Sequence, residues 1–148
     1  MSVAVDVAAD NVRVPLSRAR VAAIARGVLR AERVRDALLS LAFVSAPAMT
    51  RLNARHLGRR RATDVIAFGF TRATVADPVI GDIYICPSVA AGHARRLGVG
   101  VREEIARLVV HGTLHVLGYD HPDDESRTTS PMWRRQEILL RRAFASSA

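Results

Sequence analysis

Residues 101–117 form the strongest helical pattern in this chain and restrict how the rest of it can fold. Apolar side chains cover most sides of the helix that this segment would form, namely Ile105, Leu108, Val109, Val110, Leu114, Val116 and Leu117. A helix that is apolar on most sides is stable only when other elements surround it. The segment therefore predicts a buried central helix.

This predicted helix also carries two histidines, and a third follows it closely. His111 and His115 are four positions apart, so they project from the same face of a helix. Gly118 suits the left-handed turn that ends many helices, and it leaves His121 close enough to converge on the first two histidines. Three neutral imidazoles are a common ligand set of catalytic zinc. The sequence therefore predicts a metal site made of His111, His115 and His121.

A chance arrangement of the histidines is the alternative. It would place imidazoles among leucine and valine side chains, which costs free energy unless the ring nitrogens find polar partners. A metal ion is one such partner.

The same spacing occurs in the zinc-protease pattern H-E-x-x-H-x-x-G-x-x-H. The protease has a glutamate after the first histidine as general base, whereas this chain has Gly112. Glycine cannot move a proton, which argues against a peptidase. Gly112 also has a structural interpretation, the close approach of a neighbouring strand to the helix. Asp120 can accept a proton or orient a histidine, and both roles stay open, while residues 123–125 are expected to form a solvated acidic loop.

The composition favours a small domain that binds polyanions. The 148 residues are 49% hydrophobic, which suits one globular domain over residues 1–148. The 22 basic residues, all of them arginine, exceed the 14 acidic residues and give a net charge of +8. Arginine suits bidentate phosphate contacts, so nucleic acid is the first candidate partner.

Two further features bear on the compartment. Cys86 is the single cysteine, so it cannot form an intramolecular disulfide, and we interpret it as a core residue in a reducing environment. The chain has neither a signal-peptide pattern nor an apolar run long enough to span a membrane. We therefore expect a cytoplasmic protein without membrane contact.

The other periodic segments predict an α+β fold with a small mixed β-sheet of about four strands and about five helices. The expected strands are residues 2–7, 37–44, 64–70 and 80–86, the second of them being a continuous apolar run that suits a buried strand. The expected helices cover residues 17–31, with Ser17 as N-cap, then 45–56, 87–97 and 101–117, and a last helix starts at residues 130–131.

At the histidines the chain resembles the YbeY family of bacterial endoribonucleases and rRNA maturation factors. The segment His111-Gly-x-Leu-His115-x-x-Gly118-Tyr-Asp-His121 reproduces that family's signature, including the glycine after the first histidine. The resemblance extends over about residues 50–140. Further matching segments are Leu52-Asn53 and residues 63–68, 81–85, 132–133 and 136–139.

The resemblance implies a metal-dependent hydrolase that cuts single-stranded RNA, with one Zn²⁺ per chain held by the three histidines. It also implies a part in 16S rRNA 3′-end maturation, rRNA processing and ribosome quality control, with the small ribosomal subunit as partner. The implied fold is a small α+β sandwich with the metal at the mouth of a cleft.

The chain departs from the family pattern where phosphate contacts are expected. Leu57 occupies the position of an arginine thought to assist catalysis, so Arg59 becomes the nearest candidate to stabilise charge on the phosphate. We assign catalytic roles to Arg59 and Asp120.

Five arginines between residues 51 and 61, with no acidic residue among them, predict a phosphate-binding strip. His56 takes the family's aromatic position and is suited to stack on a base. The predicted RNA-binding residues are Arg55, His56, Arg59, Arg60 and Arg61, and the alternative for this segment is a solvated charged loop. His93 is expected to be structural or surface-exposed.

Two other functions stay open at this level. One is a non-catalytic ribosome assembly factor with structural zinc, although structural sites usually have four protein ligands and this motif supplies three. The other is a metallopeptidase, which Gly112 and the basic charge disfavour. The oligomeric state is left open by the sequence.

Overall fold

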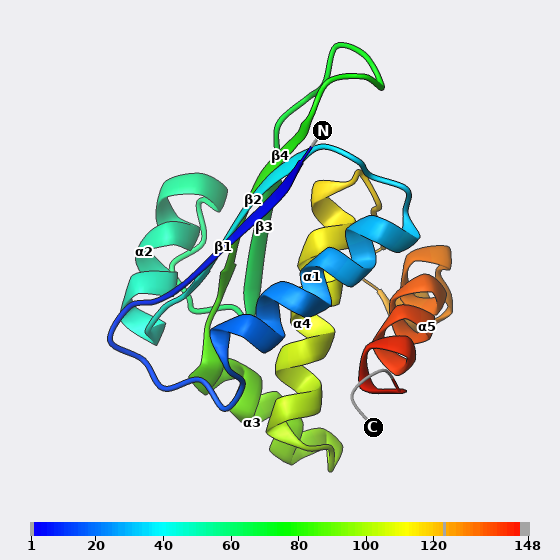
Figure 1. Cartoon of the computed structure of the whole chain (residues 1–148). Helices are drawn as coiled ribbons and strands as arrows, with labels where there is room; N and C mark the ends of the chain where they lie inside the picture. Colours follow the sequence, from blue (N-terminus) through cyan, green and yellow to red (C-terminus); the bar gives the residue numbers. More distant parts are fainter. Residues whose placement is uncertain (1, 123, 146–148) are drawn as a thin grey trace.

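The protein consists of a four-stranded mixed sheet with helices on both faces (Figure 1). This arrangement confirms the predicted order of elements and the α+β class. The computed structural model describes residues 2–122 and 124–145. The strands in this part are β1 (Val3–Ala9), β2 (Ala37–Phe43), β3 (Val65–Gly69) and β4 (Val79–Ile85). The α-helices are α1 (Arg18–Ala31), α2 (Ala46–Leu57), α3 (Pro87–Leu97), α4 (Val101–Val116) and α5 (Pro131–Ala145). A short 3₁₀ helix, η1 (Glu125–Thr129), was not predicted.

The strands lie in the order β1-β2-β4-β3, in which β1, β2 and β4 are parallel and β3 is antiparallel to β4. Parallel neighbours need long crossover connections, and helices supply them here. Helix α2 lies on one face of the sheet, whereas α1, α4 and α5 lie on the other (Figure 1). Two apolar clusters result, one on each face.

The larger cluster lies between the sheet and helices α1 and α4 and contains Leu39, Leu41 and Phe43 of β2. The smaller cluster lies under α2 and contains Met49, Ile66 and Cys86, which confirms the cysteine as a core residue. Strand β2 is buried along one face only. Leu38 on its other face is 50% exposed, so the apolar run 37–44 is not buried throughout.

Helix α4 is the central buried helix that its apolar pattern predicts, and it contacts α1, α3, α5, β3 and β4. Three glycines allow this close packing. A Cβ atom on Gly69 would lie 2.7 Å from the backbone oxygen of Val116, and one on Gly81 would lie 2.4 Å from that residue's Cγ1. A Cβ on Gly112 would lie 2.8 Å from Cγ2 of Ile83 on β4. The structural interpretation of Gly112 is therefore confirmed.

The ends of the elements follow the predicted capping chemistry. The hydroxyl of Ser17 accepts a hydrogen bond from the backbone N–H of Arg20 at 3.0 Å and caps α1. After α4, Gly118 adopts a φ of 101°, and the N–H of Tyr119 donates to the carbonyl of Leu114 at 3.0 Å. This left-handed turn sends the chain back toward the helix that it has just left.

Within residues 2–122 and 124–145, no helix has the length and apolar character needed to cross a membrane.

We predict that Gly69→Ala lowers the free energy of unfolding by about 1–3 kcal/mol, because the new methyl group meets the backbone of α4, which cannot yield like a flexible side chain. Gly27→Ala is the matched control, since nothing lies within 4 Å of a Cβ at that helical position. It should be neutral or stabilising by up to about 1 kcal/mol. Urea unfolding of both variants is the measurement, and equal stability of the two would contradict the close approach.

Candidate metal centre

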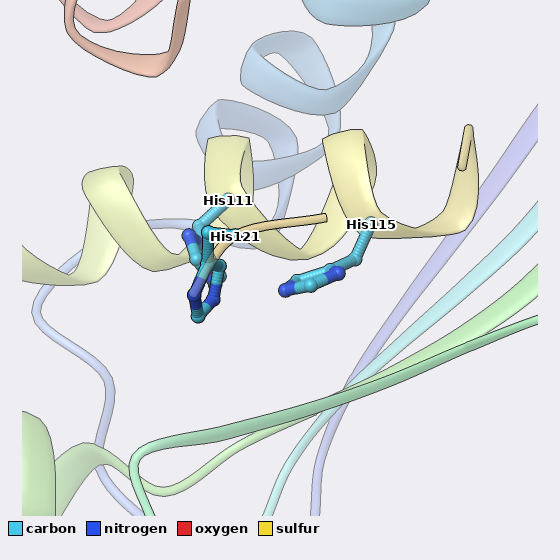
Figure 2. Close-up of side chains that lie close together, drawn as sticks. All are labelled: His111, His115 and His121. Atoms are coloured by element: carbon cyan, nitrogen blue, oxygen red, sulfur yellow. The ribbon is translucent and has the colours of Figure 1, made fainter. Parts of the chain in front are cut away.

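Three histidine side chains converge beside the C-terminal half of α4 (Figure 2). His111 and His115 project from α4, and His121 returns to them from the loop after it. Their ring centroids are 4.7 Å apart for His111 and His115 and 5.1 Å apart for the two pairs with His121. One nitrogen from each ring lies within 4.8 Å of the other two. The predicted ligands are thus brought together, at a spacing that one metal ion can bridge.

His111 is the most constrained of the three. It is 5% exposed, and its Nδ1 lies 2.6 Å from Oε1 of Gln136 on α5. Because the amide oxygen only accepts, Nδ1 carries the proton and Nε2 keeps its lone pair for a metal. Burial lowers the pKa of His111 to about 4 despite the Gln136 hydrogen bond. The ring is therefore neutral at pH 7, which is the form that binds metal.

The hydrogen bond of its Nε2 group sets the orientation of the Gln136 amide. Its Nε2 donates to Oε2 of Glu137 at 3.1 Å, which leaves the oxygen facing His111. Glu137 in turn accepts from Nε of Arg107 at 3.0 Å. Burial opposes ionisation of Glu137, but the hydrogen bonds from Arg107 and Gln136 and the charges of Arg107 and Arg141 together outweigh it and hold the pKa of this carboxyl below its ordinary value. A chain of charge-assisted hydrogen bonds thus orients a metal ligand.

His121 is also oriented by a neighbouring group, and burial acts on His115 as it does on His111. Nδ1 of His121 donates to the carbonyl of Pro122 at 3.0 Å, which leaves Nε2 as its metal-binding atom. The backbone N–H of His121 donates to Oδ1 of Asp120 at 2.8 Å, so this carboxylate supports the loop that carries the ligand. Burial lowers the pKa of His115, and the charges of His121 and Arg127 add to the effect. The donor set fits zinc, because imidazole nitrogens are among its usual ligands, and the three residues that would hold it line the cavity.

A cavity of about 530 Å³ opens at the three histidines. Of the residues predicted from sequence, Arg59, Arg61 and Asp120 line it, together with Leu57. Arg55, His56 and Arg60 are exposed but are not among the lining residues. The structure thus places part of the arginine strip beside the metal site and part outside it.

Asn53 helps to position the arginine strip of residues 51–61. This buried side chain donates through Nδ2 to the carbonyl of Met49 at 3.2 Å and to the hydroxyl of Thr63 at 3.0 Å. The bond to Thr63 joins α2 to the segment that enters β3, and Arg59 and Arg61 between them line the cavity. His56 packs against the ring of Phe68 with a centroid distance of 4.9 Å.

Sequence reasoning missed three features around the histidines. Nδ1 of His93 lies 3.2 Å from Oδ2 of Asp64, and both line the cavity, whereas His93 was expected to be structural or at the surface. Arg127 of η1 also lines it. Gln136 lies in a segment that matches the YbeY family, and this signal pointed to the residue without giving its role. Arg127 carried no sequence signal.

We predict that Gln136→Met weakens zinc binding about 10–100-fold, because His111 loses the acceptor that orients its ring. Arg134→Met is the matched control on the same helix, where the side chain is exposed. Competition with a zinc-sensitive dye measures both affinities. Unchanged affinity in Gln136→Met would show that the hydrogen bond is not needed for the ligand geometry.

The burial of His111 also predicts acid sensitivity of chelator-treated protein. Its pKa is about 4 in the fold against 6.5 in an ordinary environment, so the unfolded chain binds more protons between these values. Stability should therefore fall as the pH drops from 7 to 4.5, by on the order of 2 kcal/mol from this group. Urea unfolding at several pH values tests this, and His111→Gln should flatten the profile. A profile equally steep in the variant would assign the effect to other groups.

Comparison with known proteins gives consistent matches over most of the chain. A model of the family described as Endoribonuclease YbeY matches residues 6–143. Among curated relatives named Endoribonuclease YbeY, one from Frankia casuarinae is 37% identical, with 93% of this chain and 73% of the relative covered. The relative from Thermobifida fusca is 39% identical, with 92% of this chain and 91% of the relative covered. The relative from Beutenbergia cavernae is 41% identical, with 76% of this chain and 81% of the relative covered.

A solved structure has the same fold. The solution structure of TM1509 from Thermotoga maritima superposes with a TM-score of 0.64 at 20% sequence identity, covering 97% of this chain and 91% of that protein. At this identity the likeness shows the arrangement of helices and strands alone.

Proposed function

The chain belongs to the YbeY endoribonuclease family, and we propose that it is a zinc-dependent endoribonuclease that cuts single-stranded RNA. As a member of this family it is a hydrolase acting on RNA. The observation that carries the zinc part of the proposal is the convergence of three imidazoles at the wall of an open cavity, one nitrogen of each lying within 4.8 Å of the others. We propose one Zn²⁺ per chain, held by His111, His115 and His121.

The chemistry of the donor set supports zinc. Imidazole nitrogens suit this ion, and a three-histidine shell keeps a position open for substrate. When bound there, zinc would supply Lewis acidity next to the scissile phosphate. The protein contributes the orientation of the ligands, above all the Gln136 amide behind His111. Gln136 therefore acts as a positioning residue.

We assign the other proposed roles to residues in and beside the cavity wall. Arg59 and Arg61 are exposed there and would attract the RNA backbone and place its phosphates at the histidines. Arg55, His56 and Arg60 lie beyond the cavity wall and would contact flanking nucleotides. Asp120 lines the cavity with a carboxylate that already supports His121, so its proposed catalytic part includes holding that ligand as well as accepting a proton.

We further propose that the substrate is ribosomal RNA and that the partner is the small ribosomal subunit. The single domain spanning residues 1–148 would act in the cytoplasm. Its reaction would contribute to 16S rRNA 3′-end maturation, rRNA processing and ribosome quality control. Family membership and the net charge of +8 support this assignment. A site that only stabilised the fold would not need an open cavity at the ion, which disfavours an assembly factor with structural zinc. Gly112 leaves a peptidase without its base.

We predict that His115→Ala reduces cleavage of a short unstructured RNA to the level of wild-type protein treated with a chelator. Added zinc should restore the chelated wild type but not the variant. The measurement is gel-resolved cleavage of an end-labelled oligonucleotide, with the double-stranded form as the control substrate. Equal cleavage by His115→Ala would contradict the metal mechanism, and tight RNA binding without cleavage in the zinc-loaded wild type would favour the assembly factor.

A further inference from the structure

We propose that Arg127 binds the RNA phosphate beside the three histidines and so supplies the positive charge that Leu57 cannot. This inference rests on the proposed endoribonuclease function and assigns a substrate contact to a residue outside the predicted arginine strip. It concerns the 3₁₀ helix η1, which the sequence did not reveal.

Arg127 has a central position at the site. Helix η1 begins four residues after His121, so the metal-binding loop leads directly into it. Arg127 lines the 530 Å³ cavity and also a neighbouring cavity of about 490 Å³. The two cavities share Asp64, His93, His111 and Arg127 as lining residues. Arg127 therefore lies, with His111, where the two cavities adjoin.

Among the side chains that the structure describes, Arg127 has no carboxylate partner, unlike the partly buried Arg107 and Arg135. Its Nε is buried without a hydrogen-bond partner, and among the described residues no carboxylate forms an ion pair with it. Arg107, by contrast, pairs with Glu104 at 2.8 Å and with Glu137 at 3.0 Å. Arg135 pairs with Glu32 at 2.7 Å. A partly buried guanidinium without such a partner is costly unless an anion joins it.

The groups around Arg127 indicate that the anion it binds is a phosphate of the RNA substrate. Arg127 shares the cavity wall with His111, His115 and His121, so its side chain lies close to the proposed ligands. A bound metal would make the region more positive still. A phosphodiester oxygen can meet both the metal and the guanidinium, and the planar fork of arginine matches phosphate geometry.

Leu57 explains why a second source of charge is needed. It lines the same cavity, is 49% exposed and offers no donor. Arg59 and Arg61 line the cavity as exposed side chains, so water and salt weaken the interaction of each with a phosphate. Arg127 is the arginine of the described cavity wall whose donor group is already desolvated, and such a group interacts more strongly with charge.

The test compares zinc-loaded wild type with Arg127→Gln, Arg127→Lys and Arg102→Gln on a labelled, unstructured RNA of about twelve nucleotides. Arg102 is exposed in the first turn of α4 and lines neither cavity, so its variant is the matched control. We expect Arg127→Gln to lower kcat/KM about 10²–10³-fold, with zinc content and Tm unchanged. Lysine should restore part of the loss, and Arg102→Gln should stay within about threefold of wild type.

A binding measurement separates substrate contact from a structural role. In the full-length His115→Ala background, which should not cleave, the salt dependence of RNA affinity is measured with and without Arg127→Gln. Loss of one phosphate contact should reduce the slope of log K against log salt by about 0.7, and Arg127→Lys should keep the slope.

Three outcomes would overturn the inference. They are a kcat/KM within about threefold of wild type in Arg127→Gln, an unchanged salt slope, and a loss of activity that is accompanied by lower Tm or zinc content in both variants. Absence of cleavage in zinc-loaded wild type would instead contradict the proposed function. In that event the salt slope still decides whether Arg127 contacts RNA.

Discussion

The burial of helix α4 between the sheet and three other helices is the constraint on which the metal site depends. Glycines at the contact surfaces let α4 approach β3 and β4, and its apolar faces are covered on the other sides by α1, α3 and α5. His111 is therefore held in an environment that favours the neutral imidazole. The hydrophobic core thus determines the protonation state of a metal ligand as well as the stability of the fold.

The charged groups around the three histidines form two sets. In the first, Arg107 of α4 pairs with Glu103, Glu104 and Glu137, and this network reaches His111 through the Gln136 amide. The second set lines the 530 Å³ cavity, where Arg59, Arg61 and Arg127 lie together with the carboxylates Asp64 and Asp120. Both carboxylates have partners within the protein, since Asp64 lies 3.2 Å from Nδ1 of His93 and Asp120 accepts from the backbone N–H of His121. The three arginines give this wall an excess of positive charge, which suits a polyanion.

Much of the fold could be predicted because the periodicity of hydrophobic residues and the capping residues of helices are local signals in the sequence. The pattern of residues 101–117 predicted α4, and the four-residue spacing with Gly118 predicted that His121 would join His111 and His115. The apolar run at residues 37–44 predicted a strand but not its half-exposed face, since that depends on how far α2 extends over the sheet. The 3₁₀ helix η1 was missed because short helices have no periodic pattern of their own.

The sequence by itself determined the elements, the convergence of the three histidines and the family, because each depends on residues that are close together in the chain. Only the tertiary structure decided which side chains surround those ligands. Gln136 meets His111 across 25 positions, and His93 meets Asp64 across 29. The path of η1 brings Arg127 to the cavity, while part of the arginine strip lies outside it. These contacts depend on the packing of α5, α3 and η1 around α4, and spacing along the chain does not encode packing between distant segments.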